Sequence, residues 1–223
     1  MTNEITTQSD NVVPMDILVQ MEEKNEVAKK EGGSGGGTWI PGIQIMQATT
    51  KLRRELKAEE GAMVLRAKSP IILPASIDFL MVTLETVAKD FSDGVIFSND
   101  ENSAVFQDIK ARADEDPAES GCCYGPEYLI YIAEYGWSTW HATNKTLRNS
   151  LSVLNKAWGQ CFSASTILIS NKKHEWYGPE LGKCANAFAL PSEDEIRSTY
   201  LKWKESLSKG SVATEEDTGD REV

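Results

Sequence analysis

The chain has 223 residues, of which 40% are hydrophobic, and its 34 acidic and 23 basic side chains give a formal charge of -11. This length suits one globular domain with tails, and no apolar run approaches the roughly 18 to 20 residues that a membrane span needs. The N-terminus, MTNEITTQSD, lacks the basic start and apolar stretch of a secretory signal. We therefore expect a cytoplasmic protein, whose average charge would repel nucleic acid.

The two ends of the chain differ in composition from the middle. Residues 1–37 are expected to form a flexible arm, able to make a short helix over 15–28 before a Gly/Ser linker that contains GGSGGG. Residues 209–223 carry five acids, two bases and no aromatic residue, which predicts a disordered acidic tail. Residues 38–208 are expected to fold as a single domain.

The first half of this domain reads mainly as β-structure. Strands are predicted over 40–47, 62–67 and 77–87, and the last of these has apolar residues on both faces, which is typical of a strand buried on both sides. Pro70 and Pro74 bound a short apolar stretch and favour an edge or a turn there. Residues 93–119 carry eight acids and two bases, so we expect a solvated excursion with a short helix near 104–113.

The second half alternates strands and helices. Strands are predicted over 127–133, 136–142 and 161–169. Between the last two, Thr143 or Asn144 is expected to cap a helix that ends at Gly159 and buries residues at helical spacing, namely Leu147, Leu151, Leu154 and Trp158. Ser192 and Glu195 predict a capping box for a final helix with a buried stripe of Ile196, Tyr200, Trp203 and Leu207.

The order of these elements predicts a mainly β or α+β fold, a small barrel with added helices. The tetrapeptide Tyr-Gly-Pro-Glu occurs twice, at 124–127 and 177–180. Gly-Pro is a turn signal, so each copy is interpreted as a turn beside a strand.

The charge is segregated along the chain. No acidic residue occurs between Glu134 and Glu175, although about six would be expected there from the overall composition. This segment has a local charge of +5 and is rich in aromatic residues. Such a mixture suits single-stranded nucleic acid, because cations meet the backbone and flat rings stack on unpaired bases. The alternatives are a solvated basic face over core tryptophans and a site for an acidic protein.

Within this segment the candidate residues fall into two groups. The stacking candidates are Tyr135, Trp137, Trp140 and His141, and the phosphate-binding candidates are Lys145, Arg148, Lys156, Lys172 and Lys173. Trp137 and Trp140 are three residues apart on one predicted strand, so they should point to opposite faces, and one of them is expected in the core.

Nothing in the sequence indicates an enzyme. The chain has two histidines and none of the GxSxG, GxxxxGK[ST], HExxH or GxGxxG patterns. The four cysteines are too few for a disulfide scaffold and suit a reducing compartment. Zinc binding by Cys122, Cys123, Cys161 and Cys184 stays an alternative, weakened by the lack of a C-x2-C spacing. We expect no cofactor and no metal.

Two longer runs carry a resemblance: GCCYGPEYLIYIAEYGWSTWHATNKTLRNSLSVLNKAW from Gly121, and TILISNKKHEWYGPELGKCANAFALPSEDEI further on. With the opening WIPGIQIMQ, they resemble proteins of tailed bacteriophages and marine viral genomes, a group with many uncharacterised members. The likeness spans 39–207 and is strongest over 121–191. It implies an OB-fold-like single-stranded DNA-binding protein of phage replication or recombination, with Lys145 and Arg148 at the basic positions of its helix.

The hypothesis from the sequence is therefore a non-catalytic, sequence-tolerant single-stranded DNA-binding protein with an OB-like barrel. It would act in the cytoplasm of the host if it is viral, with the acidic tail as a contact for phage or host replication proteins and self-association left open. The alternative is a structural or interaction protein of the virion without DNA affinity. A phage nuclease is the third hypothesis, and no carboxylate cluster in the sequence supports it.

Overall fold

The computed structural model describes residues 40–92, 96–116, 119–170, 175–184 and 187–208. The arm and the acidic tail predicted at the two ends lie outside the described residues. The elements in chain order are β1 (Gly42–Ile45), α2 (Lys51–Leu56), β2 (Met63–Arg66), β3 (Ile71–Ile72), β4 (Ser76–Asp90), β5 (Ile96–Ser98), α3 (Ala104–Glu115), β6 (Cys122–Ile132), β7 (Gly136–His141), α4 (Lys145–Ser150), the 3-10 helix η1 (Ser152–Lys156), β8 (Cys161–Ser170), β9 (Glu175–Lys183) and α5 (Glu193–Ser208).

The strands form one curved sheet in the order β3-β2-β1-β7-β6-β4-β8-β9, and β5 pairs with β4. This mainly β architecture with added helices confirms the α+β class. Neighbouring strands are antiparallel except β1 and β7, which run parallel. None of the described helices has the length and apolar character needed to cross a membrane.

The long strand β4 is the spine of the fold, because it pairs with β6 along most of its length and with β8 at its start. Its side chains alternate between two apolar clusters, as expected for a strand buried on both sides. Phe79 and Met81 join the cluster on the concave side, whereas Leu80 and Val82 pack on the other face. The predicted double burial of this strand is confirmed.

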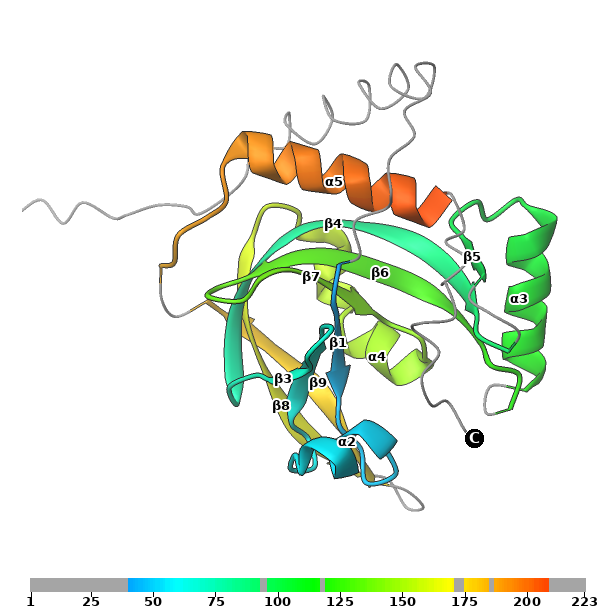
Figure 1. Ribbon diagram of the computed structural model, residues 1–223, viewed down its shortest axis with the longest axis horizontal. Coiled ribbons are helices and arrows are strands. Elements are labelled where there is room, and N and C mark those ends of the chain that lie inside the picture. Colours follow the sequence, from blue (N-terminus) through cyan, green and yellow to red (C-terminus); the bar gives the residue numbers. More distant parts are fainter. Residues whose placement is uncertain (1–39, 93–95, 117–118, 171–174, 185–186, 209–223) are drawn as a thin grey trace, which may run out of the picture.

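Helix α5 lies across the second face of β4 and β6 (Figure 1). The predicted stripe of Ile196, Tyr200, Trp203 and Leu207 is buried there against the strand residues. Half of the predicted capping box is present, since the Glu195 N–H donates to Ser192 Oγ over 3.3 Å. The Glu195 carboxylate instead accepts from the indole N–H of Trp137.

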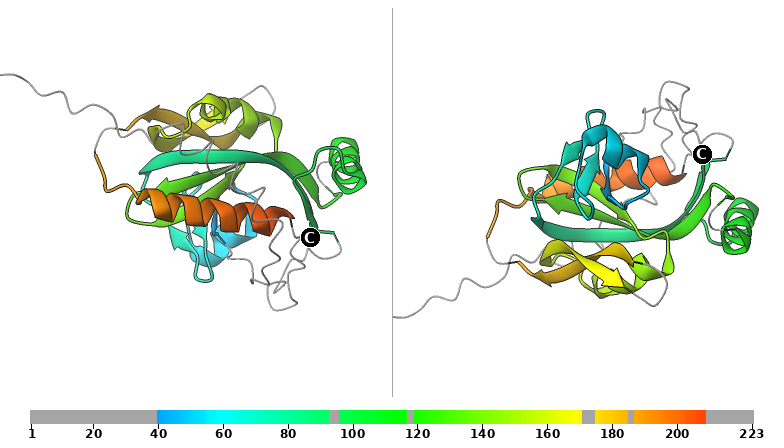
Figure 2. Two further views of the ribbon diagram at one scale, coloured as in Figure 1. Left: turned by 90° about the horizontal axis from the view of Figure 1, so that it is seen from above. Right: turned by 90° about the horizontal axis from the view of Figure 1, so that it is seen from below.

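The short helix predicted near 104–113 is confirmed as α3, but the described part of the segment 93–119 is not the solvated excursion that its charge predicted. Its helix α3 packs beside the end of the sheet, as the two views of Figure 2 show. Phe106, Ile109 and Ala113 are buried against Ala88 and Cys122. The prediction was wrong because the acids of α3 occupy its outer face, while the three apolar residues recur at the helical spacing of a buried stripe.

The predicted helix after β7 is two shorter pieces, α4 and η1. Asn144 does cap it, its side-chain oxygen accepting from the Leu147 N–H over 2.9 Å. Leu151 and Leu154 are buried as expected, but Trp158 lies beyond both pieces and is 40% exposed. The change to the tighter 3-10 winding takes Trp158 out of the buried stripe.

The two Gly-Pro motifs lie inside strands β6 and β9 and not at turns. At the first copy a Cβ on Gly125 would stand 2.2 Å from the carbonyl oxygen of Ala142. Glycine is therefore required by the close approach of two main-chain segments, and not by a turn. Pro126 still accepts through its carbonyl, from the Ala142 N–H over 2.9 Å.

Candidate binding groove

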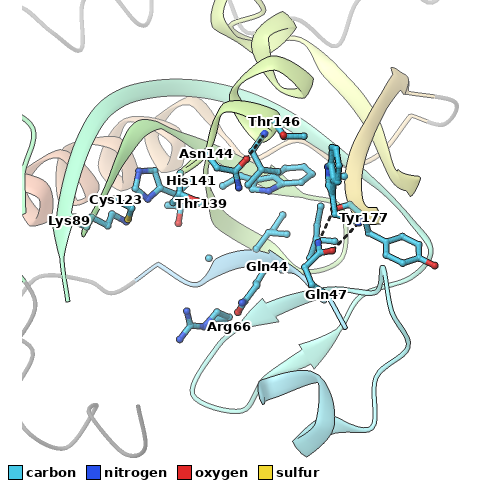
Figure 3. Close-up of a pocket in the computed structure, with 18 of the residues that line it drawn as sticks. Gln44, Gln47, Arg66, Lys89, Cys123, Thr139, His141, Asn144, Thr146 and Tyr177 are labelled. Carbon is cyan, nitrogen blue, oxygen red and sulfur yellow. Dashed lines mark hydrogen bonds between the residues drawn. The ribbon is translucent and has the colours of Figure 1, made fainter. Parts of the chain in front are cut away.

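A groove of about 790 Å³ opens where β1 and β7 separate. These parallel strands share one register pair, Gly42 with Thr139. Beyond it β1 continues toward β9, while β7 leads through Thr143 into α4. Residues of both sides line the space between them (Figure 3). The volume lies within the roughly 300 to 1,000 Å³ of typical ligand clefts.

One end of the groove is closed by the side chain of Gln47. Its amide nitrogen donates to the Tyr177 carbonyl over 2.8 Å, and its amide oxygen accepts from the Tyr177 N–H over 2.9 Å (Figure 3). These two bonds resemble those between neighbouring strands, and they join the residues just after β1 to β9, the strand at one end of the sheet. Gly61 permits this contact, because a Cβ there would lie 2.4 Å from the Tyr177 ring.

The lining of the groove is basic in an acidic protein. Three cations line it, Arg66, Lys89 and Lys145, and none of its lining residues is an aspartate or a glutamate. Amide and indole groups add hydrogen-bonding capacity, from Gln44, Asn144 and Trp176. Among the residues that the structure describes, no carboxylate lines this surface, although the chain has 34 acids.

A buried ion pair lies behind the other end of the groove. Lys89 Nζ is 2.5 Å from Glu127 Oε2, and the Glu127 side chain is 5% exposed. Burial is the largest single influence and would raise the pKa of Glu127, but the charge of Lys89, together with smaller contributions from His141 and from hydrogen bonds with Lys89 and Thr139, lowers the net pKa. This pair is therefore ionised, and it neutralises one of the three groove cations.

His141 stands beside this pair on β7, opposite Glu127 in the strand register. Burial, followed by the charge of Lys89, lowers the pKa of His141 to about 4 against the pull of Glu127. The imidazole is therefore neutral at physiological pH. Its Nε2 atom is buried without a hydrogen-bond partner among the described residues, and so is the indole nitrogen of Trp176. Both residues line the groove.

Of the predicted stacking residues, His141 and Trp140 line the groove. Trp140 cannot stack on a base, because it is 1% exposed and packs edge-on against Phe79. Trp137 points to the other face of β7, as predicted from the spacing, and its indole N–H donates to Glu195 over 3.0 Å. Tyr135 is half-buried against the concave core.

Of the predicted phosphate-binding residues, Lys145 lies at the groove. Arg148 instead covers the ring of Tyr124, with its guanidinium carbon 4.8 Å from the ring centroid. Lys156 is exposed on η1 and does not line the groove. Lys172 and Lys173 lie outside the described residues.

The sequence alone did not single out Gln44, Arg66, Lys89 or Trp176, because they come from strands far apart in the chain. One available signal was the repeated Tyr-Gly-Pro-Glu. Glu127 of the first copy holds Lys89, and Tyr177 of the second copy holds Gln47. The first copy therefore contributes the ion pair behind the groove and the second contributes the contact with Gln47, whereas the sequence alone predicts only a turn at each copy.

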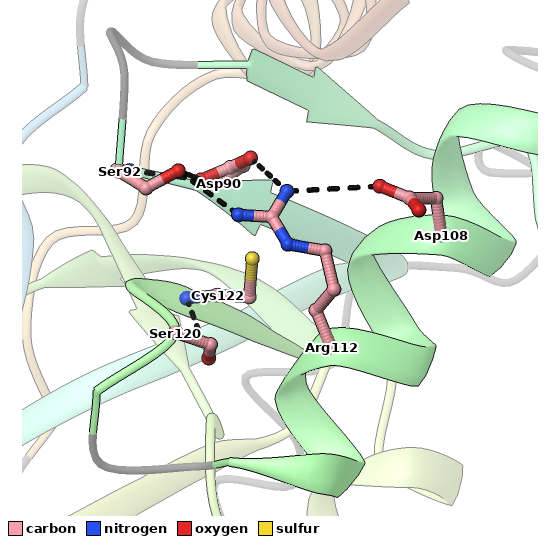
Figure 4. Close-up of polar contacts among 6 residues, drawn as sticks. All are labelled: Asp90, Ser92, Asp108, Arg112, Ser120 and Cys122. Atoms are coloured by element: carbon pink, nitrogen blue, oxygen red, sulfur yellow. Dashed lines mark hydrogen bonds and ion pairs between the residues drawn. The ribbon is translucent and has the colours of Figure 1, made fainter.

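A second polar cluster, away from the groove, attaches α3 to β4 (Figure 4). Arg112 donates to Asp90 over 2.6 Å and to Ser92 over 3.0 Å. Cys122 lies beside this cluster and is buried, and burial raises the pKa of its thiol. Among the residues that the structure describes, no three His, Cys, Asp or Glu side chains gather as a metal site would require.

No protein-family model matches this chain, and the searches of curated proteins and of solved structures returned no match. The resemblance to phage proteins stays an expectation from the sequence.

Proposed function

We propose that this protein binds single-stranded DNA in the groove between β1 and β7, without sequence preference and without catalysis. The observation that carries the proposal is a basic groove lining in which none of the described residues is a carboxylate, in a chain with a charge of -11. An acidic surface repels phosphate, so a groove without acids is where an anionic strand meets least repulsion.

The contact set differs from the one expected from the sequence. Lys145 and Arg66, both exposed, would meet phosphates from the two sides of the groove. Lys89 would contribute less, because Glu127 already balances its charge. Trp176 would offer the ring for stacking, a contact worth roughly 1 to 3 kcal/mol per base.

Curvature of the sheet supports the finer fold proposal, an OB-like barrel. The Gln47–Tyr177 bonds bring β1 to β9, and Thr166 Oγ1 donates to the Gly61 carbonyl over 2.7 Å in the same region. A curled sheet whose β1–β2 side is joined by side chains to its β8–β9 side resembles a partly open barrel. The setting we propose is the cytoplasm, in phage replication or recombination, with the acidic tail as a contact for replication proteins and self-association left open.

Fluorescence anisotropy tests the proposal. A labelled dT oligonucleotide is titrated with the protein at about 50 and 200 mM salt, beside duplex DNA of matched length. We expect tight single-strand binding that weakens steeply with salt, and weaker duplex binding. Absence of binding at low salt would refute the proposal and favour the alternative, a structural or interaction protein of the virion.

A further inference from the structure

The main chain of β1 faces two ways, because consecutive residues of a strand point their N–H and C=O groups to opposite neighbours. Met46 faces β2, since its N–H donates to the Ala62 carbonyl and its carbonyl accepts from the Gly61 N–H. Pro41 faces the other way, since its carbonyl accepts from the Thr139 N–H of β7 over 2.9 Å. The odd-numbered residues Ile43 and Ile45 therefore share the side of Pro41.

On that side the ladder to β7 stops early. The pair Gly42 with Thr139 is formed, but the next parallel pair, Gln44 with His141, is not. The missing pair would have joined the Ile43 carbonyl and the Ile45 N–H to β7. By the alternation of the strand, these two groups lie on the edge of β1 that points away from β2, and Ile43 and Ile45 are among the residues that line the groove, although their side chains are buried in the core.

This open edge is short. The next N–H along it, that of Gln47, donates to Thr50 Oγ1 over 3.0 Å. Across the groove, the His141 carbonyl accepts from the Thr143 N–H over 3.2 Å. An extended peptide added as a strand needs a longer row of open main-chain groups. A flat group with one acceptor beside one donor needs only the Ile43 carbonyl and the Ile45 N–H.

Every DNA base carries such a pair on its Watson–Crick edge: N6–H and N1 in adenine, N4–H and N3 in cytosine, O6 and N1–H in guanine, O4 and N3–H in thymine. Each base therefore matches an acceptor and a donor of the protein after a small shift along the strand edge. In a duplex the same atoms are already paired.

We propose that the β1 edge, through the Ile43 carbonyl and the Ile45 N–H, binds the Watson–Crick edge of an unpaired base. This inference rests on the proposed function and adds the cause of its selectivity: single strands bind because their base edges are open, and all four bases are accepted because each has the pair. The carboxylate-free lining favours a nucleic acid over an acidic peptide as the occupant, since Arg66 and Lys145 can meet its regularly spaced phosphates.

Modified thymine tests the inference without altering the protein. Three labelled oligonucleotides of equal length are compared by anisotropy with the full chain: oligo-dT, oligo-dU and an oligomer of N3-methylthymidine. All three keep the phosphates and the stacking faces. The dU oligomer lacks a methyl group away from the Watson–Crick edge and is the matched control. The N3-methyl group removes the donor and blocks the edge.

We expect dT and dU to bind within about threefold of each other and the N3-methyl oligomer to bind at least about tenfold more weakly, the loss of a hydrogen bond together with a steric block. Equal binding of N3-methyl and unmodified oligomers would overturn the inference while leaving the proposed function intact, because stacking and phosphate contacts would then suffice. Failure of dT itself to bind at low salt would overturn both. If dT fails to bind and an extended acidic peptide binds tightly, both proposals are overturned in favour of a protein partner.

Discussion

Removing the two exposed groove cations should flatten the salt dependence of DNA binding by a calculable amount. The perturbation is the double substitution Arg66→Ala with Lys145→Ala, which takes one cation from each side of the groove. For single strands, each phosphate contact contributes about 0.7 to the slope of log K against log salt concentration. Two lost contacts therefore lower the slope by about 1.4.

When salt rises from about 50 to 200 mM, wild type should therefore lose roughly sevenfold more affinity than the double variant loses. The assay is anisotropy of labelled oligo-dT at four or more salt concentrations. The matched control is Lys156→Ala with Lys202→Ala, which removes two exposed lysines outside the groove and changes the net charge equally. An equal flattening in both double variants would refute the placement of the phosphate contacts in the groove, because only total charge would then matter.

The remaining predictions concern stability, measured by denaturant unfolding followed by circular dichroism. Burial raises the pKa of Asp90, but hydrogen bonds from its neighbours, Arg112 among them, lower it overall below 3.8. The ionised carboxylate therefore stabilises the fold above about pH 4. The stability advantage of wild type over Asp90→Asn should shrink as the pH falls through the folded pKa of Asp90. An advantage that grows on acidification would contradict this assignment. Gly125→Ala should lower the free energy of unfolding by about 2 kcal/mol or more, because its Cβ would stand 2.2 Å from the Ala142 carbonyl oxygen and the two main-chain segments must shift apart. An unchanged denaturation midpoint would contradict this explanation. Trp203→Ala should cost about 3 to 5 kcal/mol for a ring that is 2% exposed, whereas Trp203→Phe should cost less than about 1.5 kcal/mol because the indole nitrogen has no hydrogen-bond partner among the described residues. Similar costs for the two substitutions would mean that the nitrogen matters more than the ring.

Local patterns predicted the elements whose burial depends on one stretch of sequence. The stripe of α5 recurs at helical spacing, and the residues of β4 are apolar on both faces, so each could be identified from its own segment. Asn144 could likewise be identified as a cap, because its side chain bonds an N–H only three residues away.

Features that depend on contacts between distant segments could not be predicted in this way. The buried face of α3 was hidden by its surrounding acids, and only the sheet beside it shows why Phe106 is apolar. The burial of Trp140 depends on Phe79 of β4, some 60 residues earlier in the chain. The groove needs a parallel pairing of β1 with β7 that ends after one register pair, and no property of either strand in isolation determines where such a ladder stops.

The position of α5 in the chain has a consequence for biosynthesis. This helix is translated after every strand that it covers, so Leu80, Val82 and Leu129 have no helix over them while the earlier strands leave the ribosome. Exposed apolar strands favour association between chains. The nascent protein therefore exposes this apolar face until α5 docks, and association between chains is favoured during that interval.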